Sequence, residues 1–396
     1  MDKLRTVIKD GTRDYMFGEC ELKRSIVDRL LKLFKQWGYA EIMSPTLEYY
    51  NVFNIGDTLQ NEDIYKLTDE KNRLMSLRAD CTMPIARIAA SKLNNVALPY
   101  RLCYSQNVFN NSNKLIETTQ SGVELIGSDD IRADIELLTL SVMSQKTFFN
   151  GNFRIELGHG QLFKVLTEEY EIDEVTAETA RQLIENKNFA ALETMELPVA
   201  IKILPRMFGD ITVLNDYLKL IKNNRNDYSA LKNNRVEEII NYLKNIYEKL
   251  DNIGFGHCIS FDLGLVHRLE YYTGIIFRGY VSGSGQTVLS GGRYDKLLNN
   301  YGKDLKAIGF GISVDEIFDI MKSQQVHLSS KIPDCLIFYK TPDIATAYDM
   351  AKELTYQGQN VLMSSADNLE TALEEAVSNG IKTLYIIDKK VERREI

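Results

Sequence analysis

The sequence predicts an α+β protein with a sheet-containing core, a helical insertion in that core and a small α/β domain at its C-terminal end. Apolar, glycine-punctuated segments typical of strands lie on both sides of a charged helical stretch. Near the end of the chain, strand-like and helical segments alternate. We therefore assign residues 1–325 to the core, with the insertion at about 161–255, and residues 333–396 to the small domain.

The core begins with an amphipathic helix at residues 21–37, because apolar side chains recur there on one face at helical spacing. These side chains are Ile26, Leu30, Leu33, Phe34 and Trp37. Residues 40–48 follow as a strand that Pro45 interrupts, which suits an edge or an interface rather than a sheet interior.

Strands and helices are then predicted in turn up to the insertion. The expected strands are 74–77, 98–109, 118–126 and 153–159, and the expected helices are 83–93 and 132–149. Strands return over 258–311. The last domain has the order β-α-β-α-β, which predicts a small parallel sheet. Its segments are 335–340, 343–356, 360–364, 367–379 and 382–388.

Composition indicates a globular protein of more than one domain, since 44% of the 396 residues are apolar and 26% are charged. A net charge of −8 argues against a broad nucleic-acid surface, which needs clustered Lys and Arg. The five cysteines are scattered without CxxC spacing, which favours reduced thiols. With no signal-peptide or membrane-span pattern, we expect a cytoplasmic protein.

The histidines are isolated, and none has metal-ligand spacing to a cysteine or another histidine. They are His159, His257, His267 and His327. No nucleophile-elbow or Walker pattern occurs either. We therefore expect no metal site and no cofactor.

Two residues of the predicted strand 118–126 indicate a ligand pocket. Gln120 and Glu124 are four positions apart, so their side chains share one face of the strand. A polar stripe facing solvent is the alternative. Asp80 offers a carboxylate that can hold an ammonium group by a charge-assisted bond, or can cap the helix that follows.

Several segments resemble the motifs of histidyl-tRNA synthetases, which are class II enzymes. LRADCT (77–82) is similar to their LRPEGT segment, and GLVHRLEYYTGIIFR (264–278) to LVRGLDYYTGxVFE. The three class II motifs are matched by GTRD with GYAEIMSPTLE (11–14, 38–48), by YRLCYSQNVFNN with IETTQSGVELIG (100–111, 116–127), and by SGGRYDKL with AIGFGISVDEI (290–297, 307–317).

This resemblance implies a class II aminoacyl-tRNA synthetase-like antiparallel sheet, a dimer interface at the first motif and a shortened anticodon-binding domain at the end of the chain. It also implies a histidine-binding site. Asp80 and Thr82 correspond to the residues near the amino group, and Gln120 and Glu124 to those that recognise the imidazole. Tyr271 and Tyr272 match the tyrosine pair that lines the site.

Three positions depart from the synthetase pattern. Asn110, His267 and Glu316 stand where the resemblance implies arginines for ATP and for the reacting carboxylate. Asparagine cannot supply the five-donor fork of a guanidinium, and glutamate reverses the charge. Arg268, next to His267, is displaced by one residue and would face the other side of a strand. We therefore expect no histidine activation.

A retained frame with lost arginines is similar to the regulatory subunits of ATP phosphoribosyltransferase, as is LGHGQLFKVL (157–166). That resemblance implies a non-catalytic homodimer within a hetero-oligomer, bound to the short catalytic subunit of the first step of histidine biosynthesis. It implies free histidine as a ligand and no tRNA. Two alternatives stay open, namely a divergent histidyl-tRNA synthetase and a stand-alone histidine-binding protein.

Overall fold

The computed structural model describes residues 6–55, 64–111, 115–224, 231, 233–266, 272–324 and 332–396. The chain forms two compact units, and each is described by itself. One comprises residues 1–14 and 23–324, and the other comprises residues 15–22 and 325–396.

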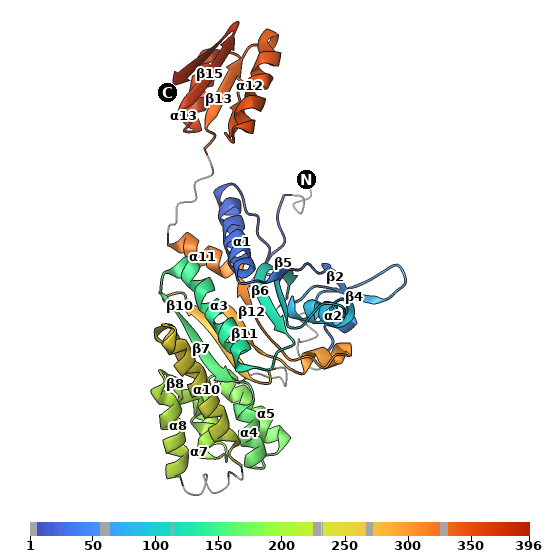
Figure 1. Cartoon of the computed structure of the whole chain (residues 1–396), viewed down its shortest axis with the longest axis vertical. Coiled ribbons are helices and arrows are strands. Elements are labelled where there is room, and N and C mark those ends of the chain that lie inside the picture. The colour runs from blue at the N-terminus through green and yellow to red at the C-terminus, as the bar shows by residue number, and fades with distance from the viewer. Residues whose placement is uncertain are drawn as a thin grey trace. The chain divides into compact units, whose positions relative to one another are not determined.

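Among the described residues, a nine-stranded sheet forms the centre of the first unit (Figure 1), in the order β1-β5-β6-β12-β11-β10-β7-β9-β8. Its strands are β1 (Ala40–Glu41), β5 (Tyr100–Phe109), β6 (Glu117–Ile126), β7 (Phe153–His159), β8 (Phe208–Gly209), β9 (Ile259–Asp262), β10 (Ile275–Val281), β11 (Thr287–Arg293) and β12 (Ala307–Ser313). All neighbours from β5 to β7 are antiparallel. The predicted antiparallel core is therefore confirmed.

Helices α1 (Gly18–Gln36) and α3 (Ile131–Phe149) pack on one face of this sheet. The ring of Phe34 on α1 meets Phe310 of β12 edge-on, with centroids 6.0 Å apart. On the same face, Gly279 of β10 lies against the side chain of Gln145 from α3. Residues that point to the opposite face are therefore left to form the candidate site.

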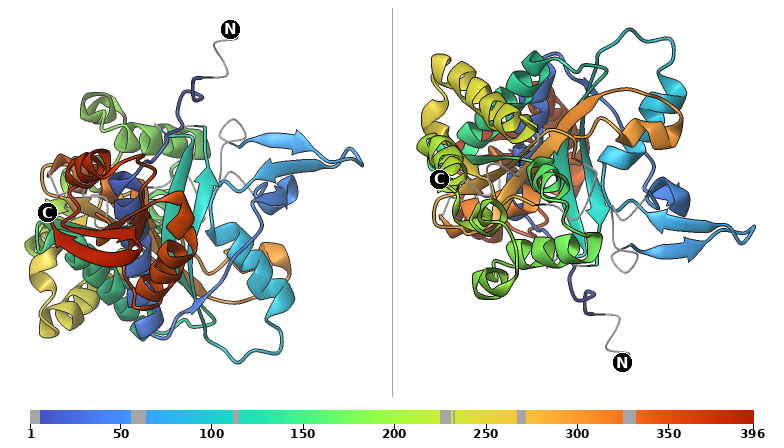
Figure 2. Two further views of the ribbon diagram at one scale, coloured as in Figure 1. Left: turned by 90° about the horizontal axis from the view of Figure 1, so that it is seen from above. Right: turned by 90° about the horizontal axis from the view of Figure 1, so that it is seen from below.

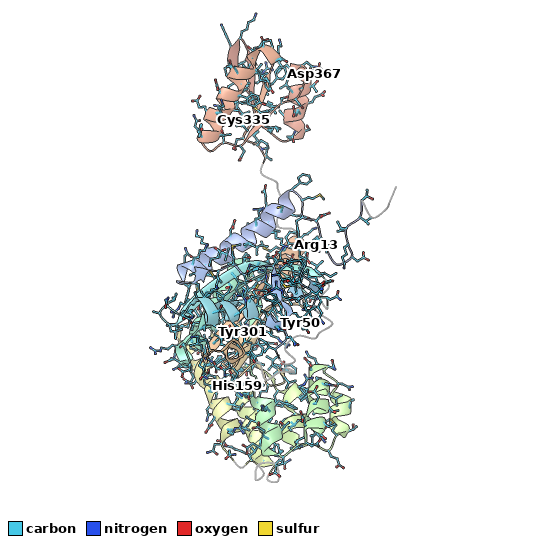
Figure 3. The ribbon with its side chains drawn as sticks, turned by 90° about the vertical axis from the view of Figure 1, so that its right-hand side faces the viewer. Arg13, Tyr50, His159, Tyr301, Cys335 and Asp367 are labelled. Atoms are coloured by element: carbon cyan, nitrogen blue, oxygen red, sulfur yellow. The ribbon has the colours of Figure 1, made fainter. Side chains whose placement is uncertain are left out.

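A second, three-stranded sheet has the order β2-β4-β3 and lies beside the large one (Figure 2). Its strands are β2 (Leu47–Tyr49), β3 (Lys66–Thr68) and β4 (Leu74–Leu77), with η2 (Tyr50–Val52) and α2 (Thr82–Lys92) adjoining. The segment around Pro45 separates β1 from β2, so the predicted strand 40–48 is two short strands in different sheets. The hydroxyl of Tyr301 donates to the carbonyl of Val52 at 2.8 Å and ties η5 (Leu297–Tyr301) to η2. Figure 3 labels Tyr301 and, in η2, Tyr50.

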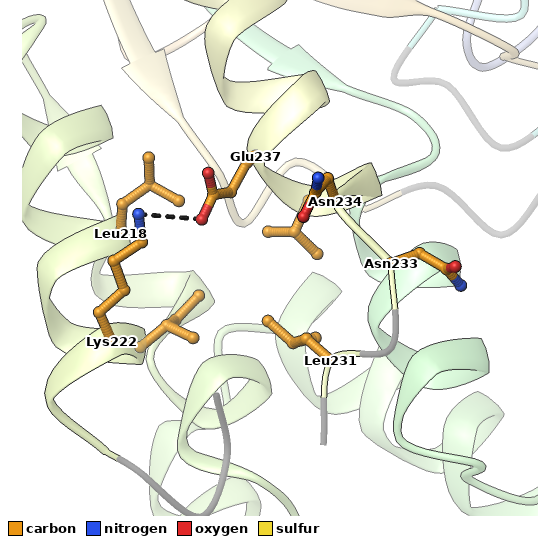
Figure 4. A pocket seen from close by; sticks show the side chains of 8 residues that line it. Leu218, Lys222, Leu231, Asn233, Asn234 and Glu237 are labelled. Carbon is orange, nitrogen blue, oxygen red and sulfur yellow. Dashed lines mark ion pairs between the residues drawn. The ribbon is translucent and has the colours of Figure 1, made fainter. Parts of the chain in front are cut away.

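The chain between β7 and β9 is mainly helical. Its elements are α4 (Leu162–Glu169), α5 (Glu174–Glu185), α6 (Phe189–Thr194), α7 (Val199–Lys202), η3 (Leu204–Arg206), α8 (Thr212–Asn223), α10 (Arg235–Asn252) and η4 (Gly256–Cys258). A pocket of about 90 Å³ lies between α8 and α10, where Lys222 pairs with Glu237 at 2.9 Å (Figure 4).

The C-terminal unit is a four-stranded sheet in the order β14-β13-β15-β16. Its elements are β13 (Cys335–Tyr339), η6 (Thr341–Asp343), α12 (Ile344–Tyr356), β14 (Val361–Met363), α13 (Leu369–Ser378), β15 (Thr383–Asp388) and β16 (Lys390–Glu395). β14, β13 and β15 are parallel, as predicted, but β16 is an additional antiparallel strand that the β-α-β-α-β pattern missed. All six side chains of β16 are exposed and all but that of Val391 are charged, so the strand has no apolar alternation to recognise.

Within the described segments, no helix has both the length and the apolar character needed to cross a membrane.

A buried ion pair holds α3 against β11. Two guanidinium nitrogens of Arg293 donate to Asp134 Oδ1 at 2.9 and 2.7 Å, and the third donates to the carbonyl of Ser128 at 2.9 Å. The hydroxyl of Tyr242 donates to the other oxygen of Asp134. Burial raises the pKa of Asp134, while the charge of Arg293 lowers it. Each member of this cluster therefore satisfies a buried polar group of another.

Replacing Arg293 by Met is expected to lower the free energy of unfolding by roughly 3–5 kcal/mol, because it leaves Asp134 buried without its cation. Urea unfolding measures this change. Arg132→Met is the matched control, since its ion pair with Asp130 has the arginine side chain 88% exposed and should change stability by less than about 1 kcal/mol. Equal effects of the two substitutions would show that the buried ion pair of Arg293 and Asp134 stabilises the fold no more than an exposed pair does.

Candidate functional site

Strand β6 presents two of the predicted site residues on the open face of the sheet. Gln120 pairs with Ser313 of β12, and Glu124 pairs with Gly309 of the same strand. Side chains at these alternate positions share a face, as the spacing predicted. The polar stripe facing solvent is excluded for Glu124, which is only 1% exposed.

Glycines of the neighbouring strands leave room for these side chains. A Cβ added at Gly309 would lie 1.6 Å from Glu124 Oε2, and one at Gly311 would lie 2.6 Å from Gln120 Nε2. Both distances are far below any tolerated contact. Any other residue at these two positions would displace the polar groups of the site.

Glu124 is the centre of a buried hydrogen-bond network. Thr82 donates through Oγ1 to Glu124 Oε1 at 2.8 Å, and the hydroxyl of Tyr294 donates to Oε2. Burial raises the pKa of Glu124 to about 8, although both hydrogen bonds oppose the shift. The carboxyl group is therefore mostly protonated at neutral pH in the unliganded protein.

Tyr294 belongs to this site, although the sequence pattern did not predict it. It lies in the SGGRYDKL motif, but its partner Glu124 lies 170 residues earlier. No local pattern relates the two. The only local signal is that Tyr294 directly follows β11, a strand of the same sheet.

Asp80 lies two residues before the first residue of α2, Thr82. Its Oδ1 accepts the backbone N–H of Met83 at 2.9 Å, so it fulfils the helix-start role that was one of the two predicted alternatives. Burial raises the pKa of Asp80 to about 6. The charge of Asp80 adds to the raised pKa of Glu124. Asp80 is thus ionised for the most part at neutral pH, while Glu124 is not.

Tyr272 packs its ring on Gly292, where an added Cβ would lie 2.6 Å from the ring. Its carbonyl accepts a bond from Gln161 Nε2 at 2.8 Å. Burial raises the pKa of Tyr272, and the nearby charge of Glu124 adds to the shift. The other predicted tyrosine, Tyr271, and the departing position His267 lie outside the described residues.

A cavity of about 940 Å³ opens over this region, and Asp80, Gln120 and Gly311 line it. Two positions where the resemblance implied arginines, Asn110 and Glu316, line it as well. The charged residues of its described lining are all acidic: Asp80, Asp315, Glu316 and Asp319. The described lining of the cavity therefore presents negative charge to a ligand.

Two cations near this acidic wall are held in ion pairs. Lys23 of α1 pairs with Asp315 at 2.7 Å, and Arg13 pairs with Asp319 at 2.6 Å. Asp315 is 2% exposed, and its second oxygen accepts the N–H of Thr119 at 2.6 Å. Asp315 and Glu316 both lie in the first turn of α11 (Val314–Ser323), where the helix dipole favours negative charge.

His159 ends β7 and is a structural residue. Burial lowers its pKa to about 4, so the ring is neutral. Its Nδ1 accepts the N–H of Gln161 at 3.2 Å, and its ring meets Tyr242 edge-on at 6.1 Å.

An antiparallel sheet with acidic and amide side chains gathered over the glycines of one face is typical of a class II synthetase core. The family signature described as histidyl-tRNA synthetase matches residues 11–317. A histidyl-tRNA synthetase from Nostoc sp. PCC 7120, 18% identical, shares the fold with a TM-score of 0.78 over 96% of this chain and 91% of its own.

The more similar relatives belong to one branch. The ATP phosphoribosyltransferase regulatory subunit of Clostridium novyi is 38% identical over 98% of this chain and 94% of its own length. A crystal structure from Bacillus halodurans, described as an ATP phosphoribosyltransferase regulatory subunit/histidyl-tRNA synthetase, has 26% identity and a TM-score of 0.82 over 96% of this chain and 98% of its own. The chain belongs to the family of ATP phosphoribosyltransferase regulatory subunits.

The Glu124→Gln variant is expected to gain stability relative to the wild type as the pH rises. The folded-state pKa of about 8 exceeds the ordinary value of 4.5, so between them the folded protein holds an extra proton. The free energy of unfolding of the wild type therefore falls across this range, and that of the variant relative to the wild type should rise by about 4 kcal/mol from about pH 5 to about pH 9. Urea unfolding at several pH values measures it.

Glu117→Gln is the matched control, because Glu117 is exposed at the start of the same strand. Its effect on the free energy of unfolding should not change with pH in this range. A Glu124 variant whose advantage shrinks toward alkaline pH would show that Glu124 is ionised when buried.

Proposed function

We propose that the chain is a non-catalytic regulatory subunit of ATP phosphoribosyltransferase. It activates the short catalytic subunit in the first step of histidine biosynthesis and mediates feedback by histidine. The transferase chemistry belongs to the partner. A cytoplasmic location is part of the proposal and agrees with the five cysteines, which are free thiols.

The observation that carries the proposal is the acidic lining of the cavity. ATP brings several negative oxygens, and adenylate formation needs cations to stabilise them. Asn110 and Glu316 stand where the resemblance implies arginines, and Lys23 and Arg13 are paired with carboxylates of the same wall. This arrangement opposes binding of a triphosphate and favours a role without synthetase catalysis over the divergent-synthetase alternative.

We also propose that free histidine binds at the open face of the sheet. The ionised carboxylate of Asp80 suits the ammonium group, and Gln120 and Glu124 suit the imidazole. Thr82 and Tyr272 complete the described part of the site, and the resemblance adds Tyr271. The protonated carboxyl of Glu124 can donate to a neutral imidazole nitrogen, which an ionised carboxylate cannot do.

Regulation then follows from linkage between the two subunits. Histidine can shift the balance between two assembled states only by the difference in its affinity for them. Regulation of this kind needs a pocket that binds histidine but no site that binds or activates ATP. The homodimer predicted at the first motif, within a larger hetero-oligomer, is part of the same proposal and agrees with the usual symmetry of such assemblies.

Mixing this chain with the short catalytic subunit is expected to produce a complex of larger mass, seen by light scattering, with higher transferase activity than the catalytic subunit alone. Histidine should inhibit the mixture. Each subunit measured separately is the control. Absence of co-elution and of activation, or pyrophosphate exchange with histidine and ATP by this chain at the rate of a synthetase, would overturn the proposed function.

Asp80→Asn is expected to weaken histidine binding about tenfold or more at neutral pH, because the amide provides no negative charge for the ammonium group. Asparagine can still accept the N–H of Met83, so the start of α2 is preserved. Asp80 has a pKa of about 6, and the loss should therefore fade toward about pH 5, where the wild-type side chain is neutral as well.

Calorimetric titration of both proteins at several pH values measures the ratio of their affinities. The titration of the ligand's own imidazole affects both proteins alike and cancels in that ratio. A ratio that stays constant across this pH range would place the ammonium group elsewhere.

A further inference from the structure

Arg278 of β10 lies on the same face of the sheet as the candidate site. It pairs with Ser290 of β11, Ser290 pairs with Gly311 of β12, and Gly311 pairs with Gly122 of β6. Directly paired residues of antiparallel strands point to the same side. Gly122 lies midway between Gln120 and Glu124, so all three positions share this side with Arg278.

The neighbours of Arg278 confirm this orientation. Phe277 meets Phe310 with ring centroids 6.3 Å apart, and Phe310 also contacts Phe34 of α1. Gly279 lies against Gln145 of α3. Both adjacent residues thus face the helices, and Arg278, between them, faces the site.

The residues between Arg278 and the site along this row of the sheet have a small side chain or none. Ser290 and Gly311 are the two positions that separate Arg278 from Gly122 along this row, and both line the cavity. Strands lie about 4.8 Å apart, which puts the backbone of Arg278 roughly 10 Å from that of Gly311. An extended arginine side chain covers most of that distance, and Gln120 Nε2 already lies over Gly311.

Electrostatics also connect Arg278 to the site. The charge of Arg278 lowers the pKa of Tyr272, while the charges of Glu124 and Asp80 raise it. Tyr272 therefore lies near enough to feel the charge of the guanidinium and of both carboxyl groups. The ionised Asp80 and the cationic Arg278 supply one charge of each sign, as the two charges of a free amino acid require.

Two carboxylates of the strands on the other side of β10, Glu156 of β7 and Asp262 of β9, also interact with the charge of Arg278. Burial raises the pKa values of Glu156 and Asp262, and the charge of Arg278 opposes both shifts. Lys187 acts on the same two carboxylates. A guanidinium has five N–H donors, so bonds to its neighbours leave it able to bind a carboxylate of a ligand as well.

We propose that Arg278 binds the α-carboxylate of the amino acid in this site. The inference rests on the proposed function, in which the site takes free histidine. Arg278 is then the residue that distinguishes a free amino acid from an analogue without a carboxylate. The resemblance implied an arginine for the reacting carboxylate at the position of His267. In this proposal Arg278 supplies the cation from a different position.

The test compares L-histidine with histidinol, which keeps the ammonium and imidazole groups and has a hydroxymethyl group in place of the carboxylate. Calorimetry on the full chain should show wild-type binding of histidine about 10- to 100-fold tighter than of histidinol, the range expected for one charge-assisted pair. Arg278→Gln should remove most of this preference by weakening histidine alone. Arg278→Lys should restore part of it.

Arg206→Gln is the matched control, because it removes the same charge from a side chain that is 56% exposed in the helical insertion. It should leave both affinities unchanged. If Arg278→Gln weakens both ligands equally, the residue is structural and the inference is wrong. Unchanged histidine binding in that variant also overturns it and leaves the proposed histidine site standing. A wild-type protein that binds neither ligand overturns the site and the inference together.

Discussion

The pairing of β6 with β12 sets where Gln120 and Glu124, the two central polar residues of the site, can lie. Because Gly309 stands opposite Glu124, the carboxyl group can bend over the neighbouring strand and reach Thr82 and Tyr294. A shift of this register by one residue would place Glu124 among the buried side chains under α1 and α3. The chemistry of the site therefore depends on backbone hydrogen bonds as much as on its side chains.

The same unit shows how a fold can be kept while the charge on one face changes. Glu316 carries a negative charge where the synthetase pattern has a cation, and Arg278 carries a positive charge where that pattern has a glutamate. Glu316 lies in the first turn of α11 and Arg278 in the regularly paired part of β10, so neither residue interrupts the sheet. Charge selectivity and fold are thus separable in this architecture.

Periodicity and strand pairing explain which features could be predicted. The helix at 132–149 and the strands at 98–109 and 153–159 correspond to α3, β5 and β7 within a few residues, because their apolar patterns are regular. Gln120 and Glu124 could be placed on one face for the same reason. The bond from Tyr294 to Glu124 could not, since it depends on tertiary packing of distant segments, and neither could β16, which has no apolar pattern.

Strand β16 closes the small sheet with a row of charged side chains. Lys390, Glu392, Arg393, Arg394 and Glu395 are all exposed along this edge. Another strand could pair here only by bringing its own side chains beside these charges, and such contacts disfavour edge-to-edge association. The C-terminal unit therefore protects its open sheet edge against aggregation without a covering helix.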